Sequence, residues 1–216
     1  MLTAVLGKEG APLRILCLGA HSDDIEIGCG GFVLRLLAEH PKSTVDWVVF
    51  SSDAERAAEA RRSTTDMLAS AGRSTVQIHE FRESFFPYLG TSIKELFERL
   101  KADTDPELVL THHLSDRHQD HRTIAELTWN TFRDHLIAEY EVPKYEGDLG
   151  HPNVFVPLPT EIARRKVELL ARNFPSQAAR PWFRAETFEA LMRLRGIESN
   201  APDGFAEAFH VRKLTL

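Results

Sequence analysis

LRILCLGAHSDD, residues 13–24, is the stretch that decides the fold of this chain. Its first seven residues are a near-continuous apolar run, which is typical of a strand buried in a parallel sheet. The polar residues His21, Asp23 and Asp24 follow directly, where that strand ends. Ligands of open α/β sheets bind outside the carboxyl ends of the strands, so this position favours a functional site.

Strand and helix patterns alternate from this first strand onward. Apolar runs predict the strands, and apolar residues at helical spacing predict the helices between them. We expect strands at 13–19, 45–51, 76–81 and 108–112, and helices at 32–39, 54–71, 91–102 and 118–132. This alternation predicts a Rossmann-like α/β fold of three αβα layers with a mostly parallel sheet, in a single domain over 1–216.

The last third of the chain is less regular, because prolines interrupt it from Pro143 to Pro181. The patterns there indicate strands at 154–157 and 206–214, and helices at 160–173 and 184–195. We therefore expect an irregular, Pro-rich C-terminal part.

Composition narrows the class of protein. Of 216 residues, 43% are hydrophobic and 27% are charged, as in ordinary globular proteins that bury a sizeable core. The net charge of -6 argues against nucleic acid or an anionic membrane surface as the main partner. The apolar run at 15–20 is too short for a membrane span. Cys17 and Cys29 lack a CxxC partner, so we expect free thiols in a cytoplasmic protein.

A second polar run, DRHQDH at residues 116–121, follows the fourth expected strand. In the usual strand order 3-2-1-4, strands one and four are neighbours, so both polar runs would face one crevice. Either run alone is more typical of a helix cap or a solvated turn. Together they offer two His and one Asp to a divalent metal, with an Asp and a His left for acid–base chemistry.

Spacing suggests roles for these side chains. A catalytic zinc has three protein ligands and leaves one position for water, and His21, Asp24 and His121 fit that requirement. Asp23 could take a proton from the metal-activated water. His118 shares a helix face with His121 and could stabilise an oxyanion or protonate a leaving amine.

The two runs resemble the signatures of a known family. AHSDDIEIGCGG, residues 20–31, resembles the AHPDD-x-E-x-G-x-GG signature of the PIG-L/LmbE-like zinc-dependent de-N-acetylases, which are N-acetylglucosaminyl deacetylase-like enzymes. DRHQDHR, residues 116–122, is similar to the second signature of that family, HPDHR. The resemblance covers residues 13 to about 132. Ser22 and Gln119 stand where the family has proline, and neither position supplies chemistry.

The resemblance implies a role for each matching residue. The residues that match the zinc ligands of the family are His21, Asp24 and His121. Asp23 matches the general base, and His118 matches the residue that assists at the oxyanion or leaving group. The resemblance also implies that Asp120 orients His118. A His–Asp–His set accepts other divalent metals such as Fe²⁺, so the metal is expected to be Zn²⁺ with Fe²⁺ as an alternative.

Arg56 is a further candidate near the start of the second expected helix. The family often has an R-x-x-E pattern there, so Arg56 could contact a hydroxyl or phosphate of the substrate. The alternative is a solvated ion pair with Glu59, three residues along the helix. The sequence leaves both interpretations open.

These observations predict a metal-dependent hydrolase that removes an N-acetyl group from a small substrate, an amino sugar or its conjugate. An amidase or deacylase for a thiol-sugar or non-sugar amide is a second hypothesis. A protein that binds a sugar or nucleotide without catalysis is a third. The aromatic loop at 85–88 and the Pro-rich C-terminal part are compatible with a homo-oligomer.

Overall fold

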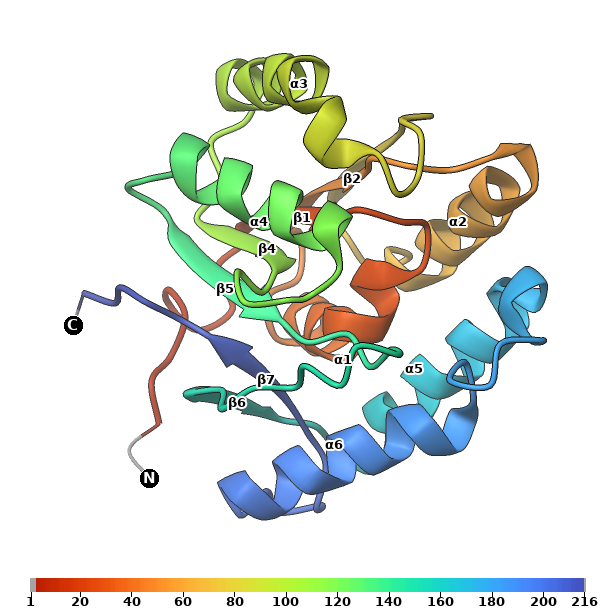
Figure 1. Cartoon of the computed structure of the whole chain (residues 1–216). Helices are drawn as coiled ribbons and strands as arrows, with labels where there is room; N and C mark the ends of the chain where they lie inside the picture. The colour runs from red at the N-terminus through yellow and green to blue at the C-terminus, as the bar shows by residue number, and fades with distance from the viewer. Residues whose placement is uncertain (1–2, 216) are drawn as a thin grey trace.

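A seven-stranded sheet runs through the centre of the computed structural model, which describes residues 3–215 (Figure 1). Its strands are β1 (Arg14–Gly19), β2 (Thr44–Val49), β3 (Arg73–Ile78), β4 (Leu108–His112), β5 (Leu136–Tyr140), β6 (Val154–Pro157) and β7 (Ala206–His210). They lie in the order β3-β2-β1-β4-β5-β7-β6. The expected order 3-2-1-4 is therefore confirmed, and the fold is Rossmann-like.

The sheet is mostly parallel. β1 pairs in parallel with both β2 and β4, and β3 and β5 extend the parallel part on either side. β7 then pairs antiparallel with β5 and β6. As a result the carboxyl ends of β1 and β4 are neighbours, and both polar runs of the sequence begin at this edge.

Helices cover both faces of the sheet. They are α1 (Asp24–Glu39), α2 (Ala54–Met67), α3 (Gly90–Asp103), α4 (Gln119–Thr131), α5 (Thr160–Asn173) and α6 (Ala185–Ser199), with short 3-10 helices at Phe86–Tyr88 and Pro175–Gln177. One apolar core holds side chains of α1, α2, α5 and α6 against the sheet. A second core holds α3 and α4 against the opposite face, so the molecule has three layers (Figure 1).

The first helix is longer than the sequence predicts. We expected it over 32–39, after a glycine-containing turn, but α1 already begins at Asp24. A Cβ atom on Gly28 would lie 2.1 Å from Cδ2 of Tyr140, and one on Gly31 would lie 2.6 Å from Cδ1 of Leu158. These glycines are thus inside the helix, where they allow it to pack closely on neighbouring side chains.

The C-terminal part is more regular than expected. β5 was not predicted, because its five residues include Glu139, a residue type that is depleted in strands. The buried Glu139 carboxylate accepts hydrogen bonds from His113 Nδ1, the Leu114 amide and Trp129 Nε1, which explains why it is tolerated there. β6 and α5 have the predicted bounds, whereas α6 runs on to Ser199 and β7 ends earlier, at His210.

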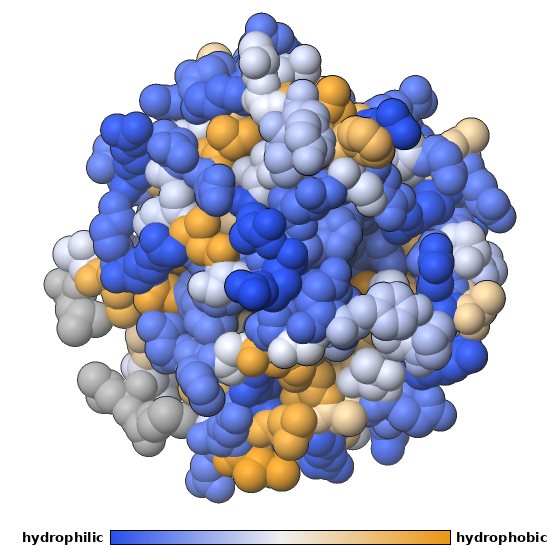
Figure 2. All heavy atoms as spheres, viewed as in Figure 1, coloured by the Kyte–Doolittle hydropathy of each residue, from blue (hydrophilic) through white to orange (hydrophobic). Residues whose placement is uncertain are grey.

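The surface seen in Figure 2 is mainly hydrophilic, with small apolar patches between charged side chains. Within residues 3–215, no helix combines the length and apolar character needed to cross a membrane. Cys17 and Cys29 are both free thiols, as expected, and the structure buries both of them.

Candidate metal centre

The two polar runs meet at the carboxyl ends of β1 and β4. His21 lies in the turn between β1 and α1, and Asp24 is the first residue of α1. His121 lies in the first turn of α4, which follows the loop after β4. All three side chains are almost fully buried. Residues separated by about a hundred positions in the sequence are therefore brought into one crevice.

Three donor atoms form a small triangle in this crevice. Nδ1 of His21 lies 3.3 Å from Oδ2 of Asp24 and 3.2 Å from Nε2 of His121. Oδ2 of Asp24 and Nε2 of His121 are 3.5 Å apart. Ligands bound tetrahedrally at about 2.1 Å from one ion are about 3.4 Å from one another, so the triangle has the size that a zinc site requires.

Each imidazole of the triangle also contacts a carboxylate on its other side. Nε2 of His21 lies 3.3 Å from Oδ2 of Asp120, and Nδ1 of His121 lies 2.8 Å from Oδ2 of Asp116. Such a carboxylate fixes the tautomer and the orientation of a metal-binding imidazole. Nε2 of His121 is then left without a proton and free to bind a cation, and Nδ1 of His21 can bind the same cation once its proton is displaced.

His112 belongs to an overlapping set of potential ligands. One ligand atom each from Asp24, His112 and His121 lies within 4.8 Å of the others, as do atoms of His21, His118 and His121. Nε2 of His112, however, is 2.9 Å from the amide nitrogen of Ala20, which donates a hydrogen bond to it. The lone pair of that nitrogen is engaged, so His112 is less suited to bind a metal than His21.

The charges in the crevice favour a cation. Burial alone would lower the pKa of His21, but the carboxylates of Asp24 and Asp120 raise it to about 10. Burial also acts to raise the pKa of Asp24, yet the surrounding imidazoles hold it well below its ordinary value. In the metal-free protein the carboxylates therefore retain a proton on His21, at the place where a divalent cation would replace it.

Asp23 lies beside the triangle and is held by one of its two oxygens. Oδ1 accepts a hydrogen bond from Nη2 of Arg56 at 2.9 Å. Oδ2 is buried and has no hydrogen-bond partner within residues 3–215. Burial raises the pKa of Asp23, although the charge of Arg56 opposes this change. A carboxylate with one oriented oxygen and one unpaired oxygen is equipped to accept a proton from a ligand in the crevice.

Arg56 does not form the ion pair with Glu59, one of its two sequence-based interpretations, and the substrate contact stays a prediction. Its guanidinium pairs with Asp23 and, at 3.3 Å, with Glu83 in the loop after β3. Glu59 points elsewhere and accepts hydrogen bonds from the backbone and side chain of Ser176. Arg56 therefore pairs with two residues distant in the sequence and not with Glu59, and one of the two is the candidate base.

His118 precedes α4 and is half-buried beside the triangle. Its Nδ1 accepts a hydrogen bond from the amide of Asp120 at 3.3 Å, so the neutral ring carries its proton on Nε2. Burial, followed by the charge of His21, lowers the pKa of His118. The ring centroids of His118 and His21 are 5.0 Å apart. The neutral ring can therefore donate a hydrogen bond close to the candidate metal position.

The position of Asp120 corrects one detail implied by the resemblance. We expected its carboxylate to orient His118, but the carboxylate contacts His21, and it is the backbone amide of Asp120 that contacts His118. The same carboxylate accepts hydrogen bonds from the amides of Ser84 and Phe86. Ser84 has a φ of 65°, in the left-handed region. The loop after β3 therefore adopts an uncommon backbone conformation at the residue whose amide donates to Asp120.

Asp116 and Lys144 also contribute to the site, although neither was predicted from the sequence. Asp116 begins the second polar run, and its spacing of five residues from His121 matches no single helical face. Lys144 follows β5, far from both runs, and its Nζ lies 3.0 Å from Oδ2 of Asp116. Local sequence contains no signal that could have revealed this contact.

Comparisons with known proteins are consistent with this geometry. The family model of PIG-L, described as GlcNAc-PI de-N-acetylase, matches residues 16–132, more than half of the chain. A protein of Escherichia coli K12, the uncharacterized deacetylase YaiS, is 27% identical over 148 residues. That alignment covers 65% of this chain and 80% of the relative.

Two solved structures show the same fold at low sequence identity. The N,N'-diacetylchitobiose deacetylase of Pyrococcus horikoshii, complexed with an inhibitor, has a TM-score of 0.72 and 20% identity, and the match covers 92% of this chain and 83% of the other. The 4-carboxy-2-hydroxymuconate hydratase GalB of Pseudomonas putida KT2440 has a TM-score of 0.69 and 15% identity, over 94% and 99% of the chains. One fold therefore supports two reactions, so the reaction has to be argued from the site.

Proposed function

Because this chain belongs to the PIG-L family and is a metal-dependent deacetylase, we propose that it hydrolyses the N-acetyl amide of an amino sugar or an amino-sugar conjugate. The observation that carries the proposal is the triangle of Nδ1 of His21, Oδ2 of Asp24 and Nε2 of His121, with the unpaired Oδ2 of Asp23 in the same crevice. Metal ligands and a separate base are both needed for hydrolysis of an amide by activated water.

We propose Zn²⁺ as the ion, held by His21, Asp24 and His121. Two imidazoles and one carboxylate are a common ligand set of catalytic zinc, and they leave a position open for water or substrate. When bound, zinc polarises the amide carbonyl and brings the pKa of a water molecule towards neutrality. Fe²⁺ binds to similar ligands and is the alternative ion.

Two side chains beside the triangle would have different roles in the reaction. Asp23, kept in position by Arg56 through Oδ1, accepts the proton of the attacking water on Oδ2. His118 donates a hydrogen bond from Nε2 to the carbonyl oxygen, on which negative charge develops. The proton held by Asp23 then passes to the nitrogen of the leaving amine. Acetate and the free amine are the products.

The contacts of Arg56 also support a limited role in substrate binding. One guanidinium nitrogen is occupied by Asp23 and another by Glu83, whose side chain is 55% exposed. Because the contact with Glu83 is solvated, a hydroxyl or phosphate of the substrate can replace it at little cost. Arg56 would then connect substrate binding to the orientation of the base.

Acetate release tests this function. The protein should be freed of metal with a chelator and then reconstituted with one equivalent of Zn²⁺ or of Fe²⁺. We expect zinc to restore release of acetate from N,N'-diacetylchitobiose or N-acetylglucosamine. N-acetylated thiol-sugar conjugates and simple N-acyl amines serve as comparison substrates. Faster turnover of those amides would favour the second hypothesis, and a reconstituted protein without activity on any of them would contradict the proposal.

A further inference from the structure

Lys144 is a buried cation in the loop between β5 and β6. Its Nζ lies 3.0 Å from Oδ2 of Asp116 and 2.8 Å from both carboxylate oxygens of Asp148, and it also donates to the carbonyl of Val142 at 3.3 Å. The side chains of Lys144 and Asp148 are each only 8% exposed. Asp148 in turn accepts the amide hydrogen of Arg117 at 2.6 Å. The loop is therefore joined at two points to the segment that carries Asp116.

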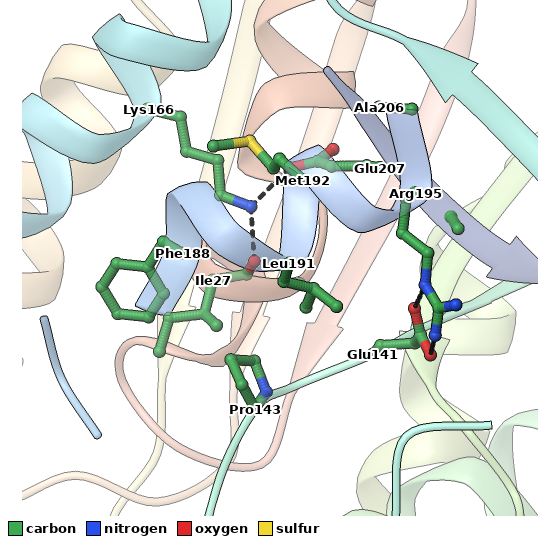
Figure 3. A pocket seen from close by; sticks show the side chains of 12 residues that line it. Ile27, Glu141, Pro143, Lys166, Phe188, Leu191, Met192, Arg195, Ala206 and Glu207 are labelled. Carbon is green, nitrogen blue, oxygen red and sulfur yellow. Dashed lines mark hydrogen bonds and ion pairs between the residues drawn. The ribbon is translucent and has the colours of Figure 1, made fainter. Parts of the chain in front are cut away.

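The structure of the loop holds Lys144 in this place. Arg195 of α6 forms a two-pronged ion pair with Glu141 at the start of the loop, as Figure 3 shows, and it donates to the carbonyl of Gly150 at the end. One guanidinium thus ties the two ends of the loop together. Between them, Gly147 has a φ of 60°, which lets the chain turn and return Asp148 to the side of Lys144.

These contacts continue to the candidate metal centre. Oδ2 of Asp116 forms an ion pair with the ammonium of Lys144 and accepts a hydrogen bond from Nδ1–H of His121, while Oδ1 accepts a hydrogen bond from the amide of His118. The chain of contacts from Lys144 through Asp116 ends on the imidazole whose Nε2 faces the metal position. The corresponding carboxylate on the other side, Asp120, is held by backbone amides instead.

We infer that Lys144 and Asp148 form a positioning pair for the metal centre, which fixes Asp116 and through it the ring of His121. The inference rests on the proposed function, because it takes His121 to be a metal ligand. It adds a contribution from the C-terminal third of the chain, outside the residues that match the family model. Without the pair, the ring of His121 loses part of its fixed orientation and the centre retains its metal less well.

Substitution of Lys144 or Asp148 alone changes the net charge near the metal position, which by itself alters the affinity for a cation. Removing Lys144 alone takes a positive charge away from the site, and this change by itself favours binding of a cation. Removing Asp148 alone has the opposite electrostatic effect. The double variant Lys144→Met/Asp148→Asn leaves the net charge unchanged, so its effect on metal affinity reports mainly on position.

A matched control exists on α3. Lys94 and Glu98 are also an ion pair of Lys with an acid four residues later, and Lys94 contacts α4 only at its last residue, Thr131, ten positions after His121. Lys94→Met/Glu98→Gln removes the same two charges at a solvated position. A third variant, Lys144→Arg, retains a cation with several donors and should preserve the contacts with Asp116 and Asp148.

Competition with a chromophoric zinc chelator measures the affinity of each protein for Zn²⁺ directly, without the need for a substrate. Outer contacts of metal-bound imidazoles commonly contribute about 10- to 100-fold to metal affinity, and Lys144 is one contact further away. We expect about tenfold weaker binding for the Lys144/Asp148 double variant, with values close to the wild type for the Lys94/Glu98 control and for Lys144→Arg. Circular dichroism of the metal-free proteins checks that each one is folded.

The outcomes separate this inference from the function on which it rests. If the wild type itself binds no zinc, the proposed function fails. If the wild type and the folded double variant bind zinc equally well, the inference about Lys144 and Asp148 is wrong while the function stands. If the double variant does not fold, weaker binding by Lys144→Gln/Asp148→Asn supports the inference, and unchanged binding by that variant overturns it.

Discussion

Oδ2 of Asp120 lies 3.3 Å from Nε2 of His21, on the opposite side of the imidazole from Nδ1, which faces Asp24 and His121. The carboxylate has no freedom to turn away, because the amides of Ser84 and Phe86 donate hydrogen bonds to its two oxygens. Asp120 thus sets both the ring orientation of His21 and which of its nitrogens faces the metal position.

Asp120→Asn should weaken zinc binding. The asparagine amide cannot accept hydrogen bonds from His21, Ser84 and Phe86 together. In either orientation its NH₂ group, which is a donor, would face a backbone N–H that is also a donor. We expect a loss of about 10- to 100-fold in zinc affinity, measured by chelator competition. Thr65→Ala, at an exposed position of α2, is a suitable control. Wild-type affinity in the Asp120→Asn variant would show that Asp120 does not orient a ligand.

Asp23→Asn should separate catalysis from metal binding. The change keeps the size of the side chain but removes its ability to accept a proton, so turnover of an N-acetylated substrate should fall by about 10²- to 10⁴-fold. The zinc content, measured by atomic emission, should remain at the wild-type level because Asp23 is not a proposed ligand. Asp66→Asn, where α2 contacts Arg172 and Asn173 at the end of α5, should leave both quantities unchanged. Full activity in the Asp23→Asn variant would refute the assignment of the base.

Gly28→Ala should strongly destabilise the fold. The added Cβ would lie 2.1 Å from Cδ2 of Tyr140, a fully buried ring whose hydroxyl donates to the carbonyl of Leu18. Overpacking of a rigid core costs about 1–3 kcal/mol or more, and this contact is short enough to reach the upper end. Gly90→Ala is the control, since nothing lies within 4 Å of its Cβ position. Urea unfolding of both variants measures the difference, and equal stability would contradict the packing described.

His210 should make stability depend on pH below neutrality. Burial, together with the charge of the stacked His113 ring, lowers the pKa of His210 to about 4, whereas an unfolded histidine has a pKa of about 6.5. Between these values the unfolded chain binds more protons than the folded one, so the contribution of His210 is complete above pH 6.5 and is lost as the pH falls through 4.

His210→Phe, which retains a stacked ring, tests this dependence. After allowance for solvent at this half-buried site, we expect the wild type to lose about 1–2 kcal/mol more stability than the variant between pH 6.5 and 4. Chemical denaturation at several pH values gives both curves. Parallel curves for the two proteins over this range would mean that His210 does not titrate as described.

Features within one segment could be predicted from the sequence, whereas contacts between segments mostly could not. The apolar run before His21 and the alternation after it predict the strand order, and the order places His21 opposite His121. The same reasoning does not reveal Lys144, because its contact with Asp116 depends on how the loop after β5 turns. Nor does it place the start of α1, because close packing against Tyr140 stabilises a glycine-rich helix that propensity alone disfavours.

The partner of Asp120 illustrates the same limit at the scale of one side chain. Its neighbour in sequence is His118, and proximity along the chain suggests that these two residues interact. In the structure the first turn of α4 directs the Asp120 carboxylate across the crevice to His21 instead. Which residue the Asp120 carboxylate contacts depends on the three-dimensional arrangement of β1, β4 and the loop after β3.

We propose that one divalent cation is bound between His21, Asp24 and His121. The most direct test is a crystal structure of the zinc-loaded protein with anomalous diffraction data collected at the zinc edge. We expect one strong peak at about 2.0–2.2 Å from Nδ1 of His21, Oδ2 of Asp24 and Nε2 of His121. A peak coordinated by His112 in place of His21, or no peak in this crevice, would contradict this proposal.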